Sequence, residues 1–206
     1  MIAFRSNVVN YLQSPPPGDD VCVAYVYCDY NDQKNQTTLN LLSSISKQFA
    51  LQHKELPEQL KELYVKHKNG QSSPSMEDYV ELLKTLSNGF RRSFIVVDAL
   101  DELSNIEDGG PVFQIDIVKH LCELQQVTTS KAGCSLFLTS RENVQIEKQL
   151  ADCRRLDIYA AESDIRLYIE DQIFDSHKFK YAKDVATNPE LGKRIISIVA
   201  GKAKGM

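Results

Sequence analysis

The stretch from Phe94 to Glu102 constrains the fold more than any other part of the chain. It opens with four apolar residues, a run of the length and composition of a buried strand, and then carries three carboxylates, those of Asp98, Asp101 and Glu102. In an open parallel sheet, ligands bind beyond the carboxyl ends of the strands. The acids are therefore expected to face a crevice, although a buried strand that runs into a solvated acidic turn would give the same pattern.

Length and charge limit the classes of function. A chain of 206 residues with 42% hydrophobic residues is long enough for one sizeable core. Its net charge of -4 argues against nucleic acid or an anionic membrane surface as a partner, because both require a concentrated basic face. No run of 18 apolar residues is present, and the first residues lack the pattern of a signal peptide. We expect a cytoplasmic protein.

The cysteines and histidines argue against zinc binding and against a thiol nucleophile. The 5 cysteines form no C-x-x-C pair, and the 4 histidines show no H-x-x-x-H or H-x-E spacing. A zinc site or a Cys-His nucleophile is therefore not expected. Buried, reduced cysteines fit a cytosolic chain.

Helical and strand-like patterns alternate along the chain. β-Branched and aromatic runs predict strands, and apolar residues at helical spacing lie between these runs. Besides the acidic strand, the predicted strands are Val21–Cys28, Ser135–Thr139 and Leu156–Ile158. Strands separated by helices imply crossover connections, so the predicted fold is α/β with a mainly parallel sheet.

Local signals set several helix boundaries. Ser75 followed three residues later by Asp78 is typical of a helix N-cap, and Asn188 before Pro189 is typical of an N-cap with proline at the first helical position. The Gly109–Pro111 segment is expected to separate the acidic strand from the next helix.

A second strand end carries a cation. Arg141 follows the apolar strand Ser135–Thr139. The parallel sheet would place its guanidinium at the same edge as the acids, where it could contact a terminal phosphate. The alternative is a surface arginine paired with Glu142 or with the end of a helix.

Four segments resemble one family. The Asp98–Glu102 segment after its apolar strand resembles the Walker B box of the NACHT class of P-loop NTPases, and the Leu136–Arg141 segment resembles their sensor 1 strand. The Val23–Gln33 segment is similar to the second strand of the nephrocystin-like NACHT proteins abundant in filamentous fungi. The Asp164–Ile169 segment resembles the helix that follows their fifth strand. These segments follow the family's order.

The resemblance implies a fold and a division of the chain. It implies a three-layer P-loop NTPase-like domain in which the sheet is flanked by helices. Residues 1–206 would form a partial NACHT domain, with an α/β core at 1–160 and the start of a helical lid region at 161–206. The family's first strand is central, and this chain would lack it, which would expose two strand edges.

The resemblance also implies roles for individual residues. Asp98 would hold Mg²⁺ through its water shell, and Asp101 or Glu102 would polarise the attacking water. Arg141 and Thr139 would contact the nucleotide, with Arg141 at the γ-phosphate of ATP. The parent would be a nucleotide switch, using ATP or GTP, in a signalling or self/non-self recognition protein. Other NACHT protomers would be its partners on activation.

One motif of the family is missing. The family cradles phosphates with G-x-x-x-x-G-K-[ST], and no such motif occurs in this sequence. The sequence resembles a domain cut just downstream of that loop, so the chain alone is expected to bind nucleotide weakly. Two other functions stay open: a non-catalytic module that pairs with a full-length relative, and a magnesium-dependent phosphohydrolase with Asp98 as nucleophile. The second lacks the spacing of D-x-D sites.

Overall fold

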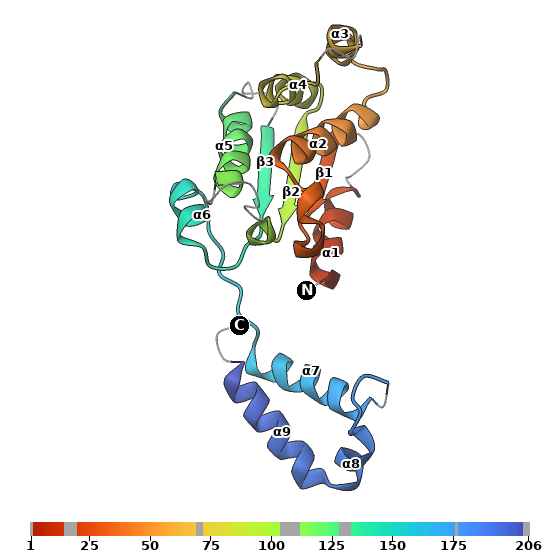
Figure 1. The fold of residues 1–206 in the computed structure, drawn as a ribbon, viewed down its shortest axis with the longest axis vertical. Coiled ribbons are helices and arrows are strands. Elements are labelled where there is room, and N and C mark those ends of the chain that lie inside the picture. Colours follow the sequence, from red (N-terminus) through yellow and green to blue (C-terminus); the bar gives the residue numbers. More distant parts are fainter. Residues whose placement is uncertain are drawn as a thin grey trace. The chain divides into compact units, whose positions relative to one another are not determined.

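The computed structural model describes residues 2–14, 20–68, 72–103, 112–127, 133–175 and 177–203. The chain forms two compact units, Met1–Asp152 and Cys153–Met206. Its elements (Figure 1) are α1 (Ile2–Leu12), β1 (Val21–Tyr27), η1 (Tyr30–Asn35), α2 (Thr38–Gln52), α3 (Glu58–His67), α4 (Met76–Asn88), β2 (Arg92–Asp98), η2 (Leu100–Glu102), α5 (Val112–Val127), β3 (Gly133–Leu138), α6 (Val144–Gln149), α7 (Glu162–Phe174), α8 (Ala182–Thr187) and α9 (Pro189–Lys202).

The first unit contains a parallel sheet with the strand order β1-β2-β3. Ile95 at the centre of β2 pairs with Ala24 of β1 and with Leu136 of β3. The predicted α/β fold with a parallel sheet is confirmed. The sequence placed the three strands to within a few residues of their bounds, because their apolar, β-branched runs are typical of buried parallel strands.

Helices cover the sheet unevenly. The main core lies between the sheet and α2, α4 and α5, where Phe49, Leu83, Ile95 and Leu121 are fully buried. Helix α1 lies against β1 and β2 on the opposite face. Within the described residues, β3 has no helix on that face, and its Phe137 is 40% exposed.

Helix α4 begins with the predicted cap. The Asp78 backbone N–H donates to Ser75 Oγ at 3.2 Å, and the Ser75 N–H donates to Asp78 Oδ2 at 2.8 Å. Lys66 of α3 donates to Asp78 Oδ1 at 2.7 Å. The hydrogen bond from Lys66, followed by the one from the Ser75 backbone, lowers the pKa of Asp78 to about 2.

Asp78 should make the stability of this domain sensitive to acid. The folded-state pKa lies below the value of about 3.9 for an unfolded aspartate, so the stabilisation is present above about pH 4 and lost as the pH falls towards 2. Asp78→Asn should lower the melting temperature at pH 7, and the difference from the native chain should shrink across this window. Thermal unfolding at a series of pH values measures this. Glu81→Gln on the same helix is the control, and a difference that does not change with pH would contradict the prediction.

The predicted strand at Leu156–Ile158 is wrong. Residues 154–160 have no regular secondary structure, and Leu156 and Ile158 are 81% and 66% exposed. A strand requires a hydrogen-bonded neighbour, and none pairs with this segment among the described residues. The alternation of apolar and polar residues in this segment gave it β propensity, but the described residues provide no neighbouring strand for it to pair with.

The second unit is helical, as the sequence predicted. Helices α7, α8 and α9 enclose a small core that includes Ile169, Val185 and Ile196. Asn188 caps α9, because its side-chain oxygen accepts from the Leu191 N–H at 3.2 Å. The predicted break at residues 109–111 lies outside the described residues. In the described parts of the chain, no helix is both long and apolar enough to cross a membrane.

Candidate functional site

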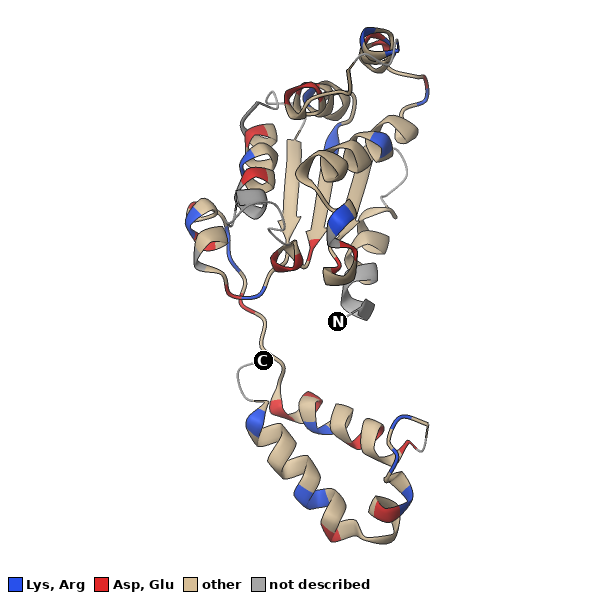
Figure 2. Ribbon diagram, viewed as in Figure 1, with Lys and Arg blue, Asp and Glu red and all other residues tan. Residues whose placement is uncertain are grey.

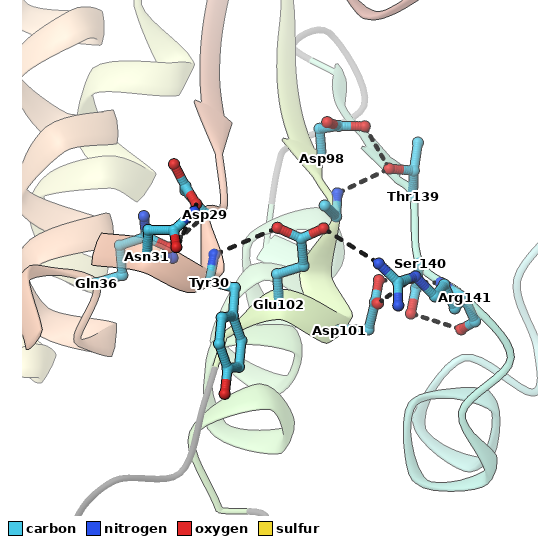
Figure 3. A network of polar contacts seen from close by, with 11 residues as sticks. Asp29, Tyr30, Asn31, Gln36, Asp98, Asp101, Glu102, Thr139, Ser140 and Arg141 are labelled. Carbon is cyan, nitrogen blue, oxygen red and sulfur yellow. Dashed lines mark hydrogen bonds and ion pairs between the residues drawn. The ribbon is translucent and has the colours of Figure 1, made fainter. Parts of the chain in front are cut away.

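The carboxyl ends of the three strands meet at one edge of the sheet. Asp29 follows β1, Asp98 ends β2 and Thr139 follows β3. Figure 2 shows acidic segments where β1 and β2 end. The predicted site residues lie on these strand ends, and Figure 3 shows the polar contacts that join them.

Thr139 binds Asp98 directly. Its hydroxyl donates to Asp98 Oδ1 at 2.5 Å and accepts from the Ala99 backbone N–H at 2.9 Å. A threonine hydroxyl has one proton, so accepting from Ala99 leaves that proton directed at Asp98. Asp98 is buried, with 4% of its surface exposed. The contact fixes the orientation of a buried carboxylate.

The backbone turns sharply after Asp98. Ala99 has φ 56° and ψ 47°, the left-handed conformation, which costs a non-glycine residue about 1–2 kcal/mol. Three contacts with Thr139 hold the turn: its hydroxyl accepts from Ala99, its carbonyl accepts from the Leu100 N–H at 2.8 Å, and its N–H donates to the Val97 carbonyl at 3.0 Å. The turn directs η2 and its two acids along the edge of the sheet.

Replacement of Thr139 should test this arrangement. Thr139→Val keeps the shape of the side chain but removes one hydrogen bond to a carboxylate and one to a backbone N–H. We expect the free energy of unfolding to fall by about 2–4 kcal/mol. Thr139→Ser keeps the hydroxyl and should lose about 1 kcal/mol or less. Urea denaturation of both variants measures the difference, and equal losses would contradict the bonding role of the hydroxyl.

Arg141 is held by both acids of η2. Its backbone N–H donates to Asp101 Oδ1 at 3.0 Å, and its Nε lies 3.3 Å from Asp101 Oδ2. A terminal guanidinium nitrogen lies 3.5 Å from Glu102 Oε1. The Arg141 side chain is 76% exposed, so these ion pairs are screened by solvent. The alternative pairing with Glu142 is not observed.

The sequence did not predict the contribution of the loop after β1. The Tyr30 N–H donates to Glu102 Oε2 at 3.3 Å, so Glu102 joins this loop to Arg141 (Figure 3). Asp29 shapes the loop, because its N–H donates to Gln36 Oε1 at 2.9 Å and its Oδ1 accepts from the Asn31 N–H at 2.9 Å. The sequence did contain a signal for this loop, because Asp29 is a third polar residue that follows a strand at the same edge of the sheet.

The donor set is compatible with magnesium bound together with a nucleotide. Within the described part of the chain, no group of three or more histidine, cysteine or acidic side chains could hold a metal alone. Mg²⁺ does not require such a group, since it keeps several waters and takes its other ligands from one or two carboxylates and from phosphates. Asp98, buried at the end of β2, is a carboxylate of the kind that such a hydrated ion takes as a ligand.

Comparison with protein families identifies the domain. The family described as Nephrocystin 3, N-terminal matches residues 3–141, a range that contains all three strands and ends at Arg141. The chain belongs to the nephrocystin 3 N-terminal family. Neither the comparison with curated proteins nor the comparison with solved structures found a match. The nephrocystin 3 N-terminal domain is associated with NACHT-type NTPase proteins, in agreement with the resemblance in the sequence.

Proposed function

We propose that this nephrocystin 3 N-terminal domain is the central segment of a nucleotide-dependent switch of the NACHT type. The observation that supports the proposal most strongly is the convergence of Asp98, Asp101, Glu102, Thr139 and Arg141 at one edge of the sheet. An edge formed by the carboxyl ends of parallel strands is where α/β proteins bind ligands. Carboxylates beside a guanidinium suit a magnesium-bound phosphate.

Each residue has a proposed role. Asp98, held by the Thr139 hydroxyl, would bind a hydrated Mg²⁺, which when present neutralises phosphate charge. Asp101 or Glu102 would orient the attacking water, and Arg141 would contact the γ-phosphate. In this proposal Thr139 acts through Asp98, which differs from the direct nucleotide contact that the sequence resemblance implied.

The contacts of Glu102 suggest how the switch operates. Glu102 joins Arg141 to the backbone of Tyr30, so these two loops share one carboxylate. A terminal phosphate would compete with Asp101 and Glu102 for the Arg141 guanidinium. Phosphate binding would then weaken the ion pair between Glu102 and Arg141 and leave the hydrogen bond from Tyr30 to Glu102 in place. Hydrolysis would restore the ion pair. In the proposed switch, these links control association with other NACHT protomers.

The phosphates themselves need a further element. The chain contains no G-x-x-x-x-G-K-[ST] motif. Figure 1 shows the N-terminal end of α1 at the same end of the sheet as the carboxyl ends of the strands. The N-terminus of a helix favours anions, so a phosphate loop joined to α1 would lie next to the proposed site. ATP or GTP with Mg²⁺ is the proposed ligand.

The missing motif favours a second candidate function. Without a phosphate loop, the chain would act as a non-catalytic module that pairs with a full-length relative. The two functions differ in nucleotide binding, which the module does not require.

Replacing Arg141 tests the switch. In a chain preceded by a phosphate-loop segment, Arg141→Ala should weaken ATP binding by about 1.5–3 kcal/mol and leave ADP binding nearly unchanged, because the proposed contact is to the terminal phosphate alone. Isothermal titration with each nucleotide measures this. Arg155→Ala is the control, since Arg155 pairs with Asp157 outside the site. Equal losses for ATP and ADP would contradict the role of Arg141.

A further inference from the structure

The two carboxylate oxygens of Glu102 are held by groups of different mobility. Oε2 accepts from the Tyr30 backbone N–H at 3.3 Å, and Oε1 lies 3.5 Å from a terminal guanidinium nitrogen of Arg141. The Arg141 side chain is 76% exposed, so it can move towards a ligand, whereas a backbone N–H in a hydrogen-bonded turn keeps its place. The contact with Tyr30 is therefore the fixed one, and the contact with Arg141 is the exchangeable one.

Asp29 sets the direction of the Tyr30 N–H. This N–H belongs to the same planar peptide unit as the Asp29 carbonyl, so the two groups point in opposite directions. The carbonyl accepts from the Asp32 N–H at 3.1 Å, inside the turn that opens η1. The Asp29 side chain fixes the same turn, because its Oδ1 accepts from the backbone N–H and the side-chain Nδ2 of Asn31 at 2.9 and 3.0 Å. With the carbonyl directed into the turn, the N–H is directed at Glu102.

The turn is attached to the rest of the domain at both ends. Before it, the Cys28 N–H donates to the Asp98 carbonyl at 3.0 Å. After it, Nδ2 of Asn40 in α2 donates to the Asn35 carbonyl at 2.8 Å. The Tyr30 side chain is 68% exposed, and Figure 3 shows its ring pointing away from Asp98. The loop therefore offers the site a fixed backbone donor and not a side chain.

We propose that Asp29 is a positioning residue that aims the Tyr30 N–H at Glu102 and thereby holds Glu102 as the carboxylate that orients the attacking water. The inference rests on the proposed function and adds to it the element that positions this carboxylate. Asp29 touches neither the nucleotide nor the water and acts through the backbone of Tyr30.

The anchor leaves one oxygen of Glu102 for the reaction. When a terminal phosphate draws the Arg141 guanidinium away, Oε2 stays on the Tyr30 N–H and Oε1 accepts a hydrogen bond from the water. As the water oxygen bonds to the γ-phosphorus, the bond to the bridging oxygen breaks with its electron pair on the diphosphate, and the water proton passes to Oε1. Without the anchor the flexible Glu102 side chain leaves this position, and a misplacement of about 1 Å can cost about 10²-fold in rate.

Removal of one backbone N–H tests the anchor. Tyr30 is the first residue of η1, where the N–H has no partner within the helix and where proline is tolerated. In a chain preceded by a phosphate-loop segment, Tyr30→Pro deletes the donor, whereas Tyr30→Ala deletes the ring and keeps the donor. We expect kcat for ATP hydrolysis to be about 10–100-fold lower in Tyr30→Pro than in Tyr30→Ala, with KM values within about two-fold of each other. In a Glu102→Gln background the two variants should hydrolyse ATP at similar rates, because the anchored carboxylate is gone.

A second pair of variants tests Asp29. Asp29→Ala removes the oxygen that accepts from Asn31, and Asp29→Asn keeps an oxygen that can accept there. The alanine variant should lose about 10-fold in kcat with the KM for ATP nearly unchanged, and asparagine should restore most of the loss. An asparagine variant as slow as the alanine variant would assign the effect to the charge of Asp29 and overturn its positioning role.

Hydrogen exchange of the Tyr30 amide, measured by NMR, tests the anchor without nucleotide. In the native chain of 206 residues this N–H should exchange about 10-fold more slowly than in Glu102→Ala, because it donates to a charged acceptor. Asp29→Ala should speed the exchange by a similar factor, and Asp29→Asn should leave it slow. Equal exchange in the native chain and in Glu102→Ala would overturn the anchor. Circular dichroism checks that each variant is folded.

The outcomes separate this inference from the proposed function. Slow hydrolysis in Glu102→Gln, together with equal rates in Tyr30→Pro and Tyr30→Ala, would overturn the anchor and leave the proposed function in place. Normal hydrolysis in Glu102→Gln, or no hydrolysis in the chain with the phosphate-loop segment, would overturn the role of Glu102 in the proposed function and the positioning role with it.

Discussion

Replacement of Glu102 by glutamine is expected to slow ATP hydrolysis by about 10²–10⁴-fold in the domain completed with a phosphate loop, the loss typical of a missing general base. Nucleotide binding should remain, because glutamine keeps an oxygen that can accept from the Tyr30 N–H. Single-turnover hydrolysis and an equilibrium titration of the same variant separate the two effects.

Asp101→Asn is the matched control for Glu102→Gln. Asp101 accepts from the Arg141 backbone and pairs with its Nε, so its replacement should disturb the position of Arg141. If Asp101→Asn acts through Arg141, it should weaken ATP binding. Loss of the general base in Glu102→Gln should lower only the rate of ATP hydrolysis. Unchanged turnover in Glu102→Gln would exclude Glu102 as the base. A lowered rate in Asp101→Asn with ATP binding unchanged would then assign that role to Asp101.

The second large effect concerns the phosphate loop. The chain of 206 residues should show no saturable binding of Mg-ATP at micromolar concentrations, and no rise in melting temperature with nucleotide. A Walker-type loop supplies a lysine and several backbone donors, on the order of 6 kcal/mol. That corresponds to about 10⁴-fold in affinity. Binding should be restored by a segment of roughly 30–40 residues added before α1, made up of a strand, a G-x-x-x-x-G-K-[ST] loop and a short flexible linker.

The control for this experiment is the same added segment with alanine in place of its lysine. That variant should fold but bind ATP weakly. Tight Mg-ATP binding by the chain without the segment would contradict the prediction, and would mean that other residues hold the phosphates.

The sequence was informative where structure depends on neighbouring residues. The capping box of Ser75 and Asp78, and the cap at Asn188 before Pro189, were predicted and are confirmed. These signals are reliable because the donor and the acceptor lie within one helical turn of each other. The strands of the sheet were predicted because their apolar runs have few alternatives to burial.

The sequence also indicated part of the candidate site. Parallel strands present their carboxyl ends at one edge, so Asp98 and Arg141 could be placed together from their positions after two strands. That rule gives proximity but not bonding partners. It left Arg141 open to a pairing with Glu142, and it did not include the loop at Tyr30.

What the sequence determined by itself was the order of helices and strands, the local caps and the edge of the sheet where the acids gather. Tertiary structure alone decided that Thr139 binds Asp98, that Ala99 adopts a left-handed conformation, and that Glu102 reaches Tyr30. It also decided that residues 154–160 pair with no strand in the part of the chain that the structure describes. The physical reason is that a hydrogen bond between residues 40 or 72 positions apart depends on the packing that brings them together, whereas a helix cap depends on its own few residues.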